Sequence, residues 1–138
     1  MQLFLEKTFP YFVALAGALL WWQLDIAFPT GEGILGSSLT IGAILTGFLA
    51  TAKAILMALD SPVMQRIRQT AYLCDLVSYL SQAIWLSFSF CWVSLLGYFI
   101  NTASLWYGLI WITVALATAS AFIRVTNIML KILQYQGN

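Results

Sequence analysis

The sequence alternates between long apolar stretches and short polar segments. The apolar stretches cover about residues 9–28, 34–59, 76–99 and 105–123. Each is close to the roughly 20 residues that an α-helix needs to cross ~30 Å of hydrocarbon. Helices and closed barrels alone satisfy their backbone hydrogen bonds in lipid. The pattern therefore predicts an all-α, polytopic membrane protein with four transmembrane helices in a single domain, residues 1–138.

The segments between the apolar stretches carry turn and boundary signals. Proline is tolerated in the first turn of a helix and otherwise marks an end, so Pro10 and Pro29 bracket the first predicted span. Residues 60–75 form the only long connection, and their apolar positions recur at helical spacing. We expect an amphipathic cytoplasmic helix there, and a cytoplasmic helical tail over residues 124–138.

The composition agrees with a chain that uses lipid as its solvent. Hydrophobic residues make up 62% of the chain and charged residues 8%, and the mean hydropathy is +0.89. A soluble domain carries about 25% charged residues, so this chain cannot cover a water-exposed surface with polar groups. The net charge of +1 gives no basis for nucleic-acid binding, which depends on neutralising many phosphates.

The basic residues fall on one side of the predicted topology. With four spans, the two loops on the opposite side contain no Lys or Arg. Cytoplasmic loops carry the excess of Lys and Arg, so the distribution predicts a bacterial inner-membrane protein with both termini in the cytoplasm. The basic residues are Lys7, Lys53, Arg66, Arg68, Arg124 and Lys131.

Small residues recur at helical spacing in the second apolar stretch. Burial of apolar surface does not drive helices together in lipid, so close approach over small residues matters more. We therefore expect this helix to lie at the centre of the bundle. The chain also has more small-residue faces than one monomer needs to bury, which predicts a homo-oligomer. The predicted packing residues are Ala43, Gly47, Thr51 and Ala54.

Two ionisable residues fall within the predicted spans. Ionisable groups inside a membrane are costly, at ~2.5–3.5 kcal/mol on insertion scales, and are candidate functional groups. Lys53 either snorkels to the interface and pairs with Asp60 or Asp75, or takes part in an ion path or in sensing. Asp25 lies near the outer end of the first span, where its carboxylate can reach the interface.

Polar side chains on the third predicted span form one stripe, composed of Ser78, Ser81, Gln82 and Ser89. This stripe either lines a polar pathway or makes interhelical hydrogen bonds, worth on average only ~0.6 kcal/mol each; the second interpretation is favoured. The predicted cytoplasmic partner surface consists of Arg66, Arg68, Arg124 and Lys131. The last two also suit anchoring to anionic headgroups, at ~1 kcal/mol each.

Residues for catalysis or metal binding are scarce. The chain has no histidine and two cysteines, and the predicted topology places Cys74 at the cytoplasmic face and Cys91 within a span. No glycine-rich phosphate loop, nucleophile motif or metal-ligand spacing occurs. We expect no enzymatic activity, no cofactor and no metal.

Three further segments of the chain form a recognisable pattern: residues 37–39 leading into the small-residue-rich 42–54, the basic loop 66–72, and the Ala-Thr-Ala-Ser-Ala-Phe-Ile run at 117–123. In these parts the chain resembles the four-span membrane subunits of RexB-type phage-exclusion systems. The membrane component of Kiwa-type defence systems is a neighbouring resemblance. The loop here has two arginines where RexB-type loops are more basic, and no catalytic residue carries over.

This resemblance implies a membrane sensor or effector of antiphage defence. Such a protein would form an oligomeric pore, or would hold a cytosolic partner protein at the bilayer. Two other classes fit the same pattern. A small proton-coupled exporter would need an acid such as Asp25 or Glu6, and a membrane-anchor subunit of a larger complex would need only the helices.

Overall fold

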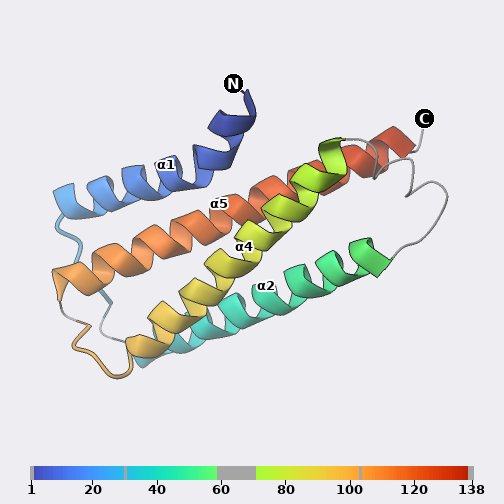
Figure 1. Ribbon diagram of the computed structural model, residues 1–138. Helices are drawn as coiled ribbons and strands as arrows, with labels where there is room; N and C mark the ends of the chain where they lie inside the picture. Colours follow the sequence, from blue (N-terminus) through green and yellow to red (C-terminus); the bar gives the residue numbers. More distant parts are fainter. Residues whose placement is uncertain (1, 30, 59–70, 103, 137–138) are drawn as a thin grey trace.

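The computed structural model describes residues 2–29, 31–58, 71–102 and 104–136, which are helical apart from short turns (Figure 1). The elements are α1 (Gln2–Gln23), α2 (Glu32–Ala58), α4 (Ala71–Leu96) and α5 (Leu105–Gln136).

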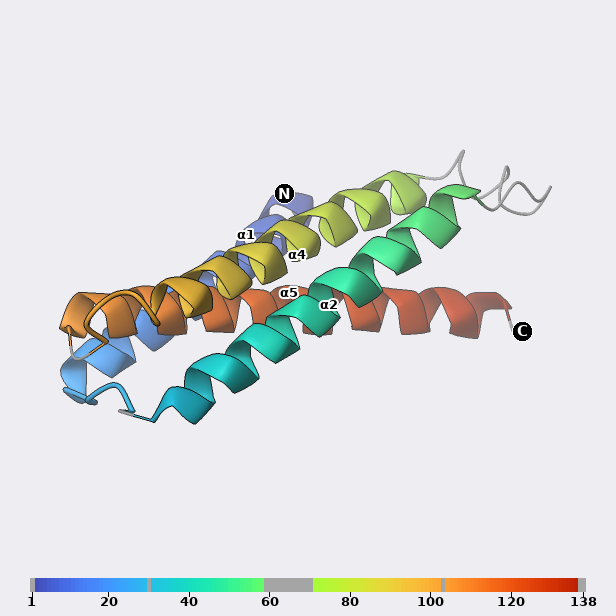
Figure 2. The ribbon, with the colours of Figure 1, turned by 90° about the horizontal axis from the view of Figure 1, so that it is seen from below.

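The four helices form an open row in the order α1, α5, α4, α2. The substantial contacts join α1 to α5, α5 to α4, and α4 to α2. The turns that follow α1 and α4 lie at one end of the row, which we call the turn end. The C-terminus lies at the opposite end, which we call the C-terminal end (Figures 1 and 2). The expected all-α fold is confirmed, but the helices do not close into a bundle around a single axis.

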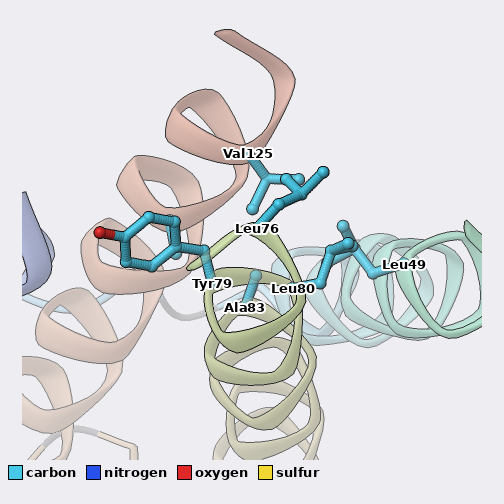
Figure 3. Close-up of a cluster of buried hydrophobic side chains, with 7 residues drawn as sticks. Leu49, Leu76, Tyr79, Leu80, Ala83 and Val125 are labelled. Atoms are coloured by element: carbon cyan, nitrogen blue, oxygen red, sulfur yellow. The ribbon is translucent and has the colours of Figure 1, made fainter. Parts of the chain in front are cut away.

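A heptad pattern holds α4 against its two neighbours. The buried positions of α4 alternate in steps of four and three, which is the spacing of helices that cross at about 20°. Figure 3 shows Leu80 of α4 facing Leu49 of α2, and Leu76 beside Val125 of α5. The buried positions with this spacing are Leu76, Leu80, Ala83, Ser87, Phe90 and Ser94, and the buried Gly97 just after the helix continues it. Tyr79 is also buried and contacts Arg124 of α5.

The expectation that α2 lies at the centre is wrong. This helix stands at the edge of the row, and only 11% of its most apolar window is buried, against 33% for α4 and α5. Ala43, Gly47, Thr51 and Ala54 are all exposed. The helix instead approaches α4 through Gly42, where an added Cβ would lie 2.7 Å from the Cys91 Sγ atom. Helix α2 does pack closely against α4 through a glycine, but this glycine lies on a neighbouring face of the helix rather than on the predicted one.

Three helices are long and apolar enough to cross a membrane, and α1 is not among them. The candidate spans are Gly33–Ala58, Asp75–Leu96 and Leu105–Lys131. The structure therefore confirms a membrane-type helical protein, while the fourth predicted crossing is not confirmed.

The predicted bounds of the first span are wrong at both ends. Helix α1 begins at Gln2, so Pro10 lies inside it and is fully buried. A proline inside a helix removes one backbone hydrogen bond and bends the axis, and the first turns of α1 point away from the rest (Figure 1). The helix ends at Gln23 because Asp25 adopts a left-handed conformation, with φ of 45°. Asp is among the few residues that tolerate it.

An aromatic cluster closes the turn end of the row. Phe28 packs edge-on against Tyr107 and Trp111, with ring centroids 5.2 and 5.4 Å apart. The Tyr107 hydroxyl donates a 3.0 Å hydrogen bond to the Val93 carbonyl of α4. This cluster ties the chain between α1 and α2 to both α4 and α5.

The packing of α2 predicts opposite effects for two matched glycine substitutions. Gly42→Ala is expected to lower the free energy of unfolding by about 1–3 kcal/mol, because the new methyl group overlaps Cys91. Gly47→Ala meets nothing within 4 Å and gains helix propensity of up to ~1 kcal/mol. Thermal unfolding in lipid nanodiscs measures both, and equal losses would contradict the observed α2–α4 contact.

Candidate functional site: the outer face of α4

The face of α4 that points away from its neighbours is polar and aromatic. Its positions continue the three-and-four spacing on the side opposite the heptad. We define the outer face as Asp75, Ser78, Gln82, Trp85, Ser89 and Trp92. Four of these side chains are exposed, including Trp85 at 69% and Trp92 at 52%. Asp75 and Gln82 are half-buried.

Local interactions fix the conformation of this face. The Ser89 hydroxyl donates a 2.8 Å hydrogen bond to the carbonyl of Trp85, one turn earlier. Phe88 packs edge-on against both Trp85 and Trp92, with centroid distances of 6.2 Å. The aromatic rings therefore form a ladder along α4 that no other helix of the subunit covers, as their exposure shows.

The depth of the outer face makes it unsuited to lipid. Trp85 lies ten residues from Asp75 and eleven from Leu96, the ends of the candidate span, which places it about 15 Å from either end. Tryptophan favours the headgroup region rather than the bilayer centre. Polar side chains inside a bilayer pack against neighbouring helices or face a water-filled cavity, so the outer face suits hydrocarbon less well than an aliphatic face does.

The exposed face of α2 is different in kind. Ile44 and Phe48 are exposed at 65% and 58%, and Ile41 and Ile55 at 54% and 55%. Branched aliphatic and phenyl side chains are what hydrocarbon tails solvate well. One edge of the row is thus suited to lipid, while the outer face of α4 is not.

Lys53 of α2 lies at the border of the outer face. Its Nζ atom donates a 2.8 Å hydrogen bond to Ser81 Oγ, and Ser81 donates in turn to the Val77 carbonyl at 2.8 Å. The expected ion pair with Asp75 does not form, and Asp60 lies outside the described residues. Among the residues that the structure describes, no carboxylate neutralises Lys53. Ser81 is therefore the anchor of this lysine, a role that spacing alone did not reveal.

Arg124 of α5 lies on the other side of α4. Its guanidinium carbon stands 3.5 Å from the centroid of the Tyr79 ring, a cation–π contact. Tyr79 and Ser81 are two residues apart, so both cations lie at one level of the row. We call this level the cationic layer, formed by Lys53, Ser81, Tyr79 and Arg124.

The cationic layer lies inside the candidate spans, near the C-terminal end of the row. Lys53 is five residues from Ala58, Ser81 six residues from Asp75 and Arg124 seven residues from Lys131, the residues that bound their spans at this end. These separations correspond to about 8–10 Å of helix. At this depth the long apolar stems of lysine and arginine can still carry their charges towards the interface. Lys131 is exposed farther along α5.

Several other candidate residues do not join this site. Asp25 is exposed in the turn after α1 and lies in none of the candidate spans. Arg66 and Arg68 lie outside the described residues. The described part of the chain holds no group of three potential metal ligands among His, Cys, Asp and Glu.

In the sequence, Ser87 and Ser94 form only a second, weaker line on the third predicted span, and their burial at the helix contacts was not predicted. Ser87 and Ser94 are fully buried on α4 and make no hydrogen bond, whereas the Thr118 hydroxyl of α5 donates to the Leu86 carbonyl at 3.1 Å. The four-and-three alternation of small residues along α4 was the available signal.

The chain matches no protein-family model, no curated protein and no solved structure in the comparisons made. The geometry of its own residues therefore carries the functional proposal.

The Arg124–Tyr79 contact predicts a difference between two substitutions of the tyrosine. Tyr79→Leu removes the ring and is expected to lower the free energy of unfolding by about 1–2 kcal/mol. Tyr79→Phe keeps the ring face and is expected to cost clearly less. Thermal unfolding in nanodiscs compares them, and equal losses for both variants would show that the ring face contributes nothing.

Proposed function

We propose that the chain is the pore-forming subunit of an oligomeric membrane assembly. Copies would turn the outer face of α4 towards a shared, water-filled path. The observation that carries this proposal is Trp85, which is exposed near the middle of a candidate span and left uncovered by the subunit's own helices, with the half-buried Gln82 one turn away. A water-filled path would solvate these side chains, because water would replace lipid at a face that lipid solvates poorly.

The open row supports an oligomer built on α4 rather than on α2. A closed bundle would leave only lipid-facing surface, whereas this row leaves a polar face and an aliphatic face on different helices. Lipid would cover α2, including Ala43 and Gly47, and other copies would meet along α4. The small-residue line of α2 is therefore not the proposed contact between copies.

The charge distribution supports an orientation for the assembly. Lys53 lies in the last turns of α2, and Arg124 and Lys131 lie in the second half of α5. Both of these helices run towards the C-terminal end of the row (Figure 1), and basic residues accumulate on the cytoplasmic side of bacterial inner membranes. This asymmetry supports a cytoplasmic location for the end of α5. A cytoplasmic N-terminus additionally requires α1 to complete a crossing.

The biological setting of the proposal is antiphage defence, as an effector that opens the membrane. It rests on the resemblance to RexB-type and Kiwa-type membrane subunits. The part of α5 beyond Arg124 is twelve residues, ending at Gln136, and would offer a cytosolic partner a helix about 18 Å long. A proton-coupled exporter has less support, because Asp25 lies outside the candidate spans.

Cysteine accessibility tests the proposed path with matched positions on one helix. In a background of Cys74→Ser and Cys91→Ala, we expect Ser78→Cys and Ser89→Cys to react with a membrane-impermeant thiol reagent in liposomes. Ser87→Cys and Ser94→Cys, on the buried heptad face, are expected to stay unreacted. The reagent should also lower any ion flux only in the first pair.

Two outcomes would overturn the proposal. One is protection of all four engineered thiols, which would leave no water along the outer face. The other is a purified assembly that contains a single copy in native lipid, measured by mass, because one subunit cannot enclose a path with one helix face.

A further inference from the structure

The fixed charges along the outer face of α4 bear on which ions the proposed path would admit. Two ionisable residues border this face in the described part of the chain, Asp75 and Lys53. Lys53 is held at Ser81, six residues along α4 from Asp75, which is about 9 Å deeper into the membrane. The charge that an ion meets deepest in the path is therefore positive.

The Lys53 ammonium is placed beside the exposed positions of the outer face. Ser81 follows Ser78 by three residues and precedes Trp85 by four, and residues at these spacings are neighbours on a helix surface. Ser78 and Trp85 are both exposed, and Lys53 reaches Ser81 from the flank of α2. The ammonium thus lies at the edge of the surface that would line the path.

No described residue compensates the charge of Lys53. An ammonium group has three hydrogen-bond donors, and Ser81 Oγ, a neutral acceptor, takes one of them. No carboxylate among the described residues pairs with it. Farther into the span, the outer face carries the hydroxyl of Ser89 and the indole N–H groups of Trp85 and Trp92, and none of these is an anion.

We propose that Lys53 is the selectivity-determining residue of an anion-conducting path, which would pass small inorganic anions such as chloride. In an assembly of identical copies, one Lys53 from each subunit would form a ring of positive charge near the cytoplasmic end of the path, inside the membrane. Rings of Lys or Arg favour anions in pores, as rings of Asp or Glu favour cations. This inference rests on the proposed pore function.

The test is the reversal potential of the full-length protein in liposomes or planar bilayers across a tenfold KCl gradient. Wild type is expected to favour chloride over potassium by about tenfold or more, because a ring of ammonium groups in a narrow path attracts anions and repels cations. Lys53→Gln keeps a donor for Ser81 and removes the charge, so it should lower the permeability ratio by about tenfold. Lys53→Glu should reverse the preference.

Lys131→Gln is the matched control, because it removes a basic residue that is exposed on α5 and distant in sequence from the outer face. It should leave the permeability ratio unchanged. A cation-selective wild type, an unchanged ratio in Lys53→Gln, or an equal shift in Lys131→Gln would each overturn the role of Lys53 while leaving the pore in place. Absence of any conductance from the oligomer would overturn the pore and the inference together.

Discussion

The structure depends on how closely α4 can approach its two neighbours. In lipid, the helices gain nothing from hiding apolar surface from water, so contact distance and backbone fit decide which faces meet. Small and hydroxyl side chains along the buried heptad of α4, such as Ala83, Ser87 and Ser94, allow that approach on both sides. Because this one face serves both α2 and α5, the opposite face is left without a partner in the subunit. The open row of helices and the uncovered polar surface therefore have the same cause, which is that one face of α4 packs against both α2 and α5.

The positions of the helices in the sequence were largely predictable, whereas the way in which they pack against one another was not. Hydropathy and length identify the three candidate spans because the bilayer imposes the same requirement on any chain. Helix α2 meets α4 through the face that carries Gly42 and not through the face that carries Gly47. Both glycines lie in lines of small residues, and the sequence of α2 does not distinguish the two lines. The decisive fact is the position of Cys91 on the other helix, which no reading of α2 by itself contains. The first helix failed for a local reason, since Asp25 rather than Pro29 ends it.

The sequence predicted the polar stripe on α4, but it did not predict that the members of this stripe would lie on two different faces. Ser78, Gln82 and Ser89 remain on one face, while Ser81 faces α2 and binds Lys53. Helical spacing alone places all four residues within one broad arc of the helix surface. Only the position of α2 shows that Ser81 binds Lys53, whereas the other three residues belong to the outer face. The same holds for Arg124, whose charge marks the interface in the sequence and whose contact with Tyr79 appears only once α4 and α5 are side by side.

The length and continuity of α5 carry a mechanical consequence. The helix runs for 32 residues, about 48 Å, and from Leu109 to its end it contains neither glycine nor proline. Such a helix lacks the glycine and proline at which helices most often kink, so it transmits a change of tilt along its length. A force applied at Gln136 would therefore change the tilt of α5 where Arg124 contacts Tyr79 of α4.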